Sequence, residues 1–141
     1  MEYMKTFKLT KHPILKKLQQ GQSIEWKGQT IDVESATTVV KGKKLTFILD
    51  TKFFPALVEH ARAADVLVCE ATHMEDLREK TEKYKHMTSK QAAELGKRAS
   101  VGKLYLTHFS QRYTDLGPLL KEARSVFPKA ELAQDLLSLA L

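Results

Sequence analysis

The sequence predicts an α/β fold, in which strands alternate with helices along the chain. Three short, nearly continuous apolar runs, at residues 45–49, 66–69 and 103–106, are typical of strands buried on both faces of a sheet. Stretches rich in helix-forming residues follow these runs. This alternation indicates βα units, with layers of helices packed against a sheet.

The N-terminal third is expected to contain shorter strands. Residues 23–26 and 29–33 alternate apolar and polar side chains around Lys27-Gly28, which favours a β-hairpin. Residues 37–40 (Thr-Thr-Val-Val) are β-branched throughout and predict a further strand.

Four helices and a last strand complete the predicted elements. The helices are expected over residues 54–64, 74–85, 88–100 and 116–126, and the strand over residues 131–139. The third helix has the clearest start, because Thr88 and Gln91 fit a capping box, in which each side chain bonds the other residue's backbone N–H. Pro128 is expected to stop the fourth helix.

Length and composition exclude several classes of protein. The 141 residues contain no Pro/Gly/Ser-rich linker, so we expect one continuous unit over residues 1–141, with residues 1–10 as an N-terminal extension. The single cysteine, Cys69, cannot form an internal disulfide, which indicates a reducing compartment and hence the cytoplasm. No apolar run approaches the roughly 18 residues of a membrane helix, and the start does not resemble a secretory signal. The net charge of +6 permits a polyanionic partner but does not by itself indicate one.

Polar side chains follow each of the three apolar runs at the point where the run ends. Asp50 follows the first run, Glu70 the second and His108 the third. The carboxyl ends of strands in an α/β sheet form the crevice in which ligands bind, so we expect these side chains at one edge. Carboxylate oxygen and imidazole nitrogen both suit Zn²⁺ or a similar divalent ion. The sequence therefore predicts a metal or acid–base site there.

Each of these residues also has an ordinary structural interpretation. Asp50 could form a turn or a helix cap, Glu70 could pair with a lysine, and His108 could be a hydrogen-bonded structural histidine. His86 precedes the capped helix, where it could donate to a phosphate or simply pack on Tyr84. The remaining histidines are expected at the surface: His12, His60 and His73.

Three motifs occur in a specific order: Cys69-Glu70-Ala71-Thr72, then His86-Met87-Thr88, then Leu106-Thr107-His108-Phe109-Ser110-Gln111-Arg112-Tyr113. They resemble the His-Glu-Ala-Thr, His-Ser-Thr and Leu-Thr-His-hydrophobic-Ser-x-Arg-Tyr motifs of ribonuclease Z. That family comprises the tRNA 3′-processing endonucleases of the metallo-β-lactamase fold. Residues 45–51 resemble its strand ending in Gly-Asp-Thr, and residues 127–135 its closing strand. The resemblance covers roughly residues 11–141.

The resemblance implies a fold and a set of roles. The fold would be the C-terminal half of an αββα sandwich, with a mixed sheet and helices on one face. Asp50 would bridge two zinc ions, and His108 would bind one of them. Glu70 and His86 would help protonate the leaving 3′ oxygen, a general-acid role that requires contact between carboxylate and imidazole.

The resemblance also implies a substrate, which would be precursor tRNA. Arg112, Lys85 and Lys90 would hold its phosphates.

The sequence departs from the family pattern in several places: Leu49 stands for Gly, Cys69 for His, Met87 for Ser and Leu136 for Gly. The principal metal motif of the family, His-x-His-x-Asp-His, is absent. Asp50 and His108 supply two ligands, whereas a zinc site typically needs three or four protein ligands per ion. We therefore expect half of a domain, whose inner sheet face would be apolar and exposed in isolation.

Two functions remain open from the sequence. In the first, the chain is half of a zinc-dependent tRNA 3′-endoribonuclease and acts in a homo- or hetero-oligomer with a partner that carries the missing histidine motif. In the second, it is a catalytically inactive module that self-associates or binds RNA. A third option, hydrolysis of a small phosphodiester, is disfavoured by the Glu70/His86 pair, which resembles the RNA-processing branch.

Overall fold

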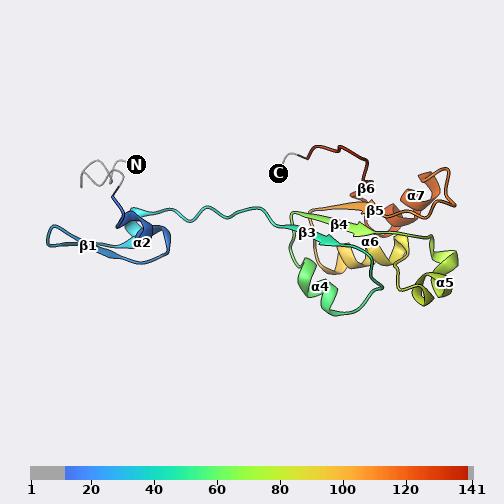
Figure 1. Cartoon of the computed structure of the whole chain (residues 1–141), viewed down its shortest axis with the longest axis horizontal. Coiled ribbons are helices and arrows are strands. Elements are labelled where there is room, and N and C mark those ends of the chain that lie inside the picture. The colour runs from blue at the N-terminus through green and yellow to red at the C-terminus, as the bar shows by residue number, and fades with distance from the viewer. Residues whose placement is uncertain (1–11, 140–141) are drawn as a thin grey trace. The chain divides into compact units, whose positions relative to one another are not determined.

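The computed structural model describes residues 12–139 and separates the chain into two compact units, one ending at Gly42 and the other beginning at Lys43 (Figure 1). We expected one continuous unit. Residues 37–44, at the boundary between the two units, form neither helix nor strand. That both units belong to one family domain stays a prediction, and the N-terminal extension expected over residues 1–10 lies outside the described residues.

The first unit contains the predicted hairpin. Its elements are α2 (Leu15–Gln19), β1 (Ile24–Trp26), β2 (Gln29–Ile31) and α3 (Val33–Ala36). β1 and β2 pair antiparallel, and the turn residues Lys27 and Gly28 have φ angles of 51° and 77°, which are typical of the two-residue turns that suit a hairpin. Leu18, Ile24 and Ile31 form a small buried core.

The strand predicted over residues 37–40 is wrong. Val39 is 93% exposed, and in the described residues this segment pairs with no strand. β-branched residues favour extended backbone, but a strand also requires a neighbour to accept its hydrogen bonds.

The second unit is the α/β layer that the sequence predicts. Its elements are β3 (Leu45–Ile48), α4 (Ala56–Ala61), β4 (Val66–Glu70), η1 (Glu75–Leu77), α5 (Arg78–Lys83), α6 (Ser89–Arg98), β5 (Lys103–Thr107), α7 (Gly117–Val126) and β6 (Ala130–Leu132). The strands lie in the order β3-β4-β5-β6, and every pair is parallel. A mixed sheet was expected, but each connection between neighbouring strands contains a helix, and such crossovers produce parallel pairs. The last strand is shorter than residues 131–139.

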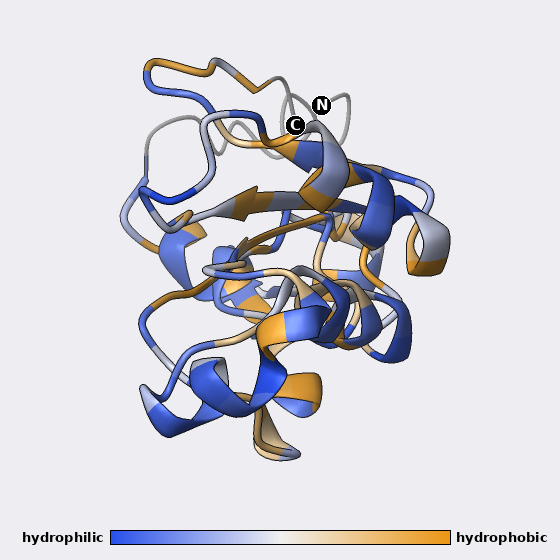
Figure 2. Cartoon of the chain, turned by 90° about the vertical axis from the view of Figure 1, so that its right-hand side faces the viewer, coloured by the Kyte–Doolittle hydropathy of each residue, from blue (hydrophilic) through white to orange (hydrophobic). Residues whose placement is uncertain are grey.

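Helices cover one face of this sheet. α6 packs against α4, α7 and the strands β4 and β5, and Figure 1 shows α4 and α6 on the same side of β3 and β4. In Figure 2 the strands are largely orange, whereas the helices carry both blue and orange stretches. The side chains that the strands bury against the helices include Ile48, Leu67, Cys69, Leu104 and Leu106. The strand register therefore aligns one apolar face for the helices.

The other face is uncovered at β3. Leu45, Phe47 and Leu49 are 41%, 56% and 51% exposed, while Thr46 and Ile48 between them are buried. The prediction that residues 45–49 are buried on both faces is therefore wrong. β3 is the edge strand of the described sheet, and no second layer of the second unit lies over its outer side chains. An exposed apolar strip is what we expect of a half-sandwich in isolation.

The capping box at the start of α6 is confirmed. The Thr88 hydroxyl accepts a hydrogen bond from the Gln91 backbone N–H at 3.1 Å, and the Thr88 backbone N–H donates to Gln91 Oε1 at 2.9 Å. This cap fixes where the preceding loop ends, and that loop carries His86. In residues 12–139, no helix combines the length and the apolar character needed to cross a bilayer.

Candidate metal centre

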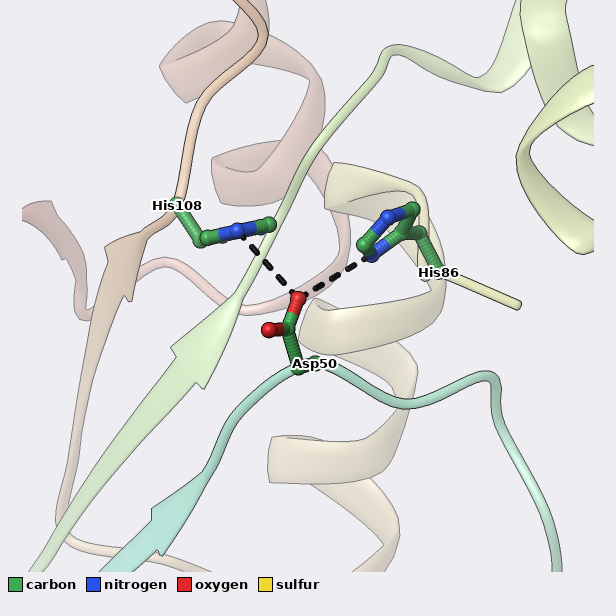
Figure 3. A group of neighbouring side chains, drawn as sticks. All are labelled: Asp50, His86 and His108. Carbon is green, nitrogen blue, oxygen red and sulfur yellow. Dashed lines mark ion pairs between the residues drawn. The ribbon is translucent and has the colours of Figure 1, made fainter. Parts of the chain in front are cut away.

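Three separate segments bring Asp50, His86 and His108 together, with one ligand atom from each lying within 4.8 Å of the others (Figure 3). Asp50 lies two residues past the end of β3, and His108 directly follows β5. β3 and β5 flank β4, and His86 lies on the loop before α6. Parallel strands end at one edge of a sheet, so the two strand-end residues meet as the sequence predicts. The loop adds His86 to the same point.

The backbone is strained at this edge. Asp50 and His108 adopt left-handed conformations, with φ angles of 53° and 57°, and Lys85, just before His86, has a φ of 63°. Residues other than glycine seldom adopt such angles, although Asp and His do so more often than most. Each instance costs on the order of 1 kcal/mol, and such strain tends to concentrate at functional sites.

The distances within the cluster fit a bound metal ion. His108 Nε2 lies 3.2 Å from Asp50 Oδ1, and His86 Nδ1 lies 3.7 Å from the same oxygen. A tetrahedral ion with bonds of about 2.0–2.1 Å holds neighbouring ligand atoms about 3.3 Å apart. One carboxylate oxygen and two imidazole nitrogens also form a donor set typical of catalytic metal sites with an open position. The residues present therefore fit a divalent metal ion.

Glu70 is a fully buried carboxylate beside the cluster. It is 0% exposed, and it accepts hydrogen bonds from the backbone N–H groups of Thr51 and Met87 and from the Thr72 hydroxyl. His86 Nδ1 lies 3.2 Å from Glu70 Oε2, so the imidazole–carboxylate contact that an acid–base role requires is present. Among residues 12–139 Glu70 pairs with His86 and with no lysine, so the alternative of a Glu70–lysine pair is wrong. The catalytic roles of Glu70 and His86 themselves stay predictions.

Thr72 is a site residue that we did not single out from the sequence. Its hydroxyl lies 2.9 Å from Glu70 Oε2 and 3.0 Å from His108 Nδ1, so it joins the buried carboxylate to a candidate metal ligand. The signal was present in the motif, because residues two apart in extended chain lie on the same side. Glu70 and Thr72 have that spacing.

A buried polar network supports the loop that carries His86. His73, expected at the surface, is buried, and its Nδ1 lies 3.1 Å from the Thr81 hydroxyl. Burial lowers the pKa of His73, and the charges of Arg112 and Lys80 lower it further. Tyr113 packs against the core and accepts a hydrogen bond from the Met74 backbone N–H at 3.0 Å. The surface prediction for His73 is wrong because Thr81 and Tyr113 lie against the ring.

The three predicted RNA contacts lie near this site in sequence or in space. Lys85 is exposed and directly precedes His86, and Lys90 is half-buried in the first turn of α6. Arg112 is exposed and close enough to His73 for its charge to act on that ring. Their phosphate-binding role stays a prediction.

Comparisons with known proteins identify relatives of the chain. Ribonuclease Z from Archaeoglobus fulgidus is 40% identical over 129 residues, which cover 90% of this chain and 42% of that protein. Ribonuclease Z from Chlamydia pneumoniae is 40% identical over 122 residues, which cover 86% of this chain and 40% of that protein. The chain spans about two fifths of the length of these curated relatives.

Two solved structures also resemble this chain. The metallo-beta-lactamase fold protein YhfI from Bacillus subtilis matches with a TM-score of 0.58 and 27% identity, over 62% of this chain and 36% of that chain. Human tRNase Z, short form, matches with a TM-score of 0.54 and 25% identity, over 77% of this chain and 35% of that chain. The predicted fold class and the resemblance to ribonuclease Z are thereby confirmed. Residues 8–109 also match the family described as Beta-lactamase superfamily domain. The chain therefore belongs to the beta-lactamase superfamily.

Proposed function

We propose that the chain supplies part of the active site of a metal-dependent endoribonuclease that processes the 3′ end of precursor tRNA. The observation that carries the proposal is the convergence of Asp50, His86 and His108 beside the buried Glu70. The curated relatives named ribonuclease Z support RNA as the substrate.

Zinc is the metal that we propose for this site. Asp50 and His108 would be its ligands from the strand ends, with Asp50 shared between two ions in the complete site. When bound, zinc would act as a Lewis acid toward the scissile phosphate and activate the attacking water. Asp50 and His108, two protein ligands, do not complete two zinc sites, so the remaining ligands would come from outside residues 12–139.

Glu70 and His86 would handle the proton in the reaction. Water adds to phosphorus, the bond from phosphorus to the 3′ oxygen breaks, and that oxygen needs a proton to leave as a hydroxyl. Protonated His86 would donate it. The Glu70 carboxylate, 3.2 Å from His86 Nδ1, would orient the imidazole and stabilise its charged form.

The basic residues around the site would hold the RNA. Lys85 and Arg112 are exposed, so their charged groups can contact phosphate oxygens from solvent. Lys90, in the first turn of α6, would add its charge where the helix N-terminus already attracts anions.

A partner chain would complete the enzyme. The apolar strip of Leu45, Phe47 and Leu49 on β3 offers a surface for it, and a shallow groove lined by Phe47, Leu49, Phe54 and His60 continues that surface. The chain matches only about two fifths of each relative, and the partner would carry the His-x-His-x-Asp-His motif. The assembly would be a homo- or hetero-oligomer.

Reconstitution tests the proposal. The purified chain should be mixed with the N-terminal portion of a ribonuclease Z that carries the histidine motif, and the complex isolated by size-exclusion chromatography. Zinc-dependent cleavage of precursor tRNA at its 3′ end is the expected result, and a chelator should abolish it. His86→Ala should slow cleavage by about 10²-fold or more while zinc stays bound. A well-formed, zinc-loaded complex that does not cleave would overturn the proposal.

The second candidate function is an inactive module that self-associates or binds RNA. The exposed β3 strip favours it, because the same surface could bury itself between two copies. Calorimetric titration with zinc of the chain mixed with the N-terminal portion of a ribonuclease Z separates the two functions. Tight binding of two zinc ions argues against the inactive module, and dimerisation without metal binding argues for it.

A further inference from the structure

The Thr72 hydroxyl lies between two groups that compete for its one proton. Glu70 Oε2 is 2.9 Å away on one side, and His108 Nδ1 is 3.0 Å away on the other. A hydroxyl has a single proton to donate and lone pairs with which to accept. Thr72 can therefore donate to one of these neighbours and must accept from the other.

The proton belongs on the Glu70 side. An ionised carboxylate can only accept hydrogen bonds, and Glu70 is 0% exposed, so water cannot replace a missing donor. Removing the Thr72 donor from the buried Glu70 carboxylate costs more free energy than removing it from an exposed group. The reason is that water cannot take the place of the donor in the interior. The His108 side chain is 44% exposed, so water can reach its ring, whereas Thr72 and Glu70 are buried.

We propose that Thr72 is a positioning residue that sets the tautomer of His108. Because Thr72 donates to Glu70, it accepts from His108, and His108 Nδ1 must carry a proton. The lone pair of the neutral ring then resides on Nε2, which lies 3.2 Å from Asp50 Oδ1, so that a metal ion between the two atoms would bind both. Hydrogen bonds to the second ring nitrogen commonly fix metal-binding histidines in this way.

This arrangement couples the acid–base pair to the metal site. A single hydroxyl connects Glu70, which contacts His86, to His108. Loss of the hydroxyl would leave His108 Nδ1 without its acceptor, and the ring could then protonate Nε2 and donate to Asp50. That tautomer presents a hydrogen, not a lone pair, toward the cluster.

Nitrogen NMR of the full chain tests the inference without substrate or turnover. The chain would be labelled with ¹⁵N-histidine, and His108 would be assigned from the signal that His108→Gln removes. Thr72→Val keeps the shape of the side chain but removes its hydroxyl, whereas Thr72→Ser keeps the hydroxyl. Both variants retain the backbone bonds from Thr72 N–H to Met87 O and from Ser110 N–H to Thr72 O. Thr46→Val, at a buried threonine of β3, is the matched control.

Three results are expected. In the metal-free wild type, His108 Nδ1 shows a directly bonded proton, and Thr72→Ser and Thr46→Val leave it unchanged. Thr72→Val shifts the ring toward the Nε2–H tautomer. Zinc affinity falls about 10–100-fold in Thr72→Val, as for other lost partners of metal ligands, and recovers in Thr72→Ser.

Other results overturn the inference. An unprotonated His108 Nδ1 in the wild type overturns the inference even if no variant folds. A His108 tautomer that is the same in Thr72→Val as in the wild type also overturns it. The inference rests on the metal role proposed for His108, yet the two ideas fail separately. Cleavage by a reconstituted enzyme with the wrong tautomer refutes only the Thr72 role, and the right tautomer without cleavage refutes only the proposed function.

Discussion

Replacing Glu70 by alanine should destabilise the second unit strongly. The carboxylate is fully buried and accepts from the Thr51 and Met87 backbone N–H groups and from the Thr72 hydroxyl. Each buried donor left without a partner costs about 1–3 kcal/mol. Thr51 is half-buried and can turn to water, and the Thr72 hydroxyl can donate instead to His108 Nδ1, 3.0 Å away. The Met87 N–H therefore counts in full, and the free energy of unfolding should fall by about 1–3 kcal/mol, out of the roughly 5–15 kcal/mol typical of a domain.

Glu70→Gln separates hydrogen bonding from charge. The amide oxygen can keep the Met87 N–H and Thr72 donors, so only the Thr51 bond is lost, at a cost of about 1 kcal/mol. Glu79→Ala, an exposed change on α5, is the control and should stay within about 0.5 kcal/mol of the wild type.

Urea denaturation followed by far-UV circular dichroism measures these differences. Fluorescence is unsuitable, because the single tryptophan, Trp26, lies in the first unit. With a slope of about 2 kcal/mol per molar urea, the midpoint for Glu70→Ala should fall by about 0.5–1.5 M. An unchanged or higher midpoint would refute the reasoning, since removing some buried charges is known to stabilise proteins. Equal losses for alanine and glutamine would refute the hydrogen-bond explanation.

Three further predictions follow from the geometry. Thr88→Ala should lower the free energy of unfolding by about 1 kcal/mol in urea titrations, because α6 loses its N-cap, and Thr88→Ser should restore most of it. Stability should fall as pH drops below about 6.5, because the pKa of His73 is lowered in the fold and the unfolded chain therefore binds the proton more readily. His73→Gln should flatten that decline in urea midpoints measured across the range. Asp50→Asn should weaken zinc binding at least about 10-fold by calorimetry, while circular dichroism stays unchanged because Asn tolerates the left-handed backbone.

A specific result would contradict each of these predictions. A Thr88→Ser variant as unstable as Thr88→Ala would mean that the hydroxyl does not cap α6. His60→Gln, at an exposed histidine, should leave the pH profile intact, and a profile that His73→Gln also leaves intact would exclude the buried ring as its cause. Unaltered zinc affinity in Asp50→Asn would remove Asp50 from the ligand set.

The parts of the site that the sequence predicts are those determined locally or by strand direction. Asp50 and His108 could be placed together because parallel strands end at the same edge, whatever the loops do. The cap formed by Thr88 and Gln91 depends on residues three apart, so it is readable from the chain alone.

The parts that the sequence does not predict depend on distant packing. Residues 37–40 have the composition of a strand but no neighbour to pair with. The apolar run at β3 is typical of burial on both faces, yet no layer of the second unit covers Phe47. The burial of His73 depends on Thr81, which lies in α5, and on Tyr113, which lies between β5 and α7. The link from Thr72 to His108 spans 36 residues.

The open edge of β3 also affects how the chain behaves in solution. In the described sheet β3 pairs only with β4, so its outer side presents unpaired backbone groups next to an apolar strip. Such edges recruit strands from other molecules and promote aggregation. Lys43, Lys44 and Lys52 flank the strand, and positive charges at these points oppose uncontrolled strand addition. Aggregation of the purified chain at high concentration should therefore increase with ionic strength, because salt screens the charges of those lysines and leaves the apolar strip exposed.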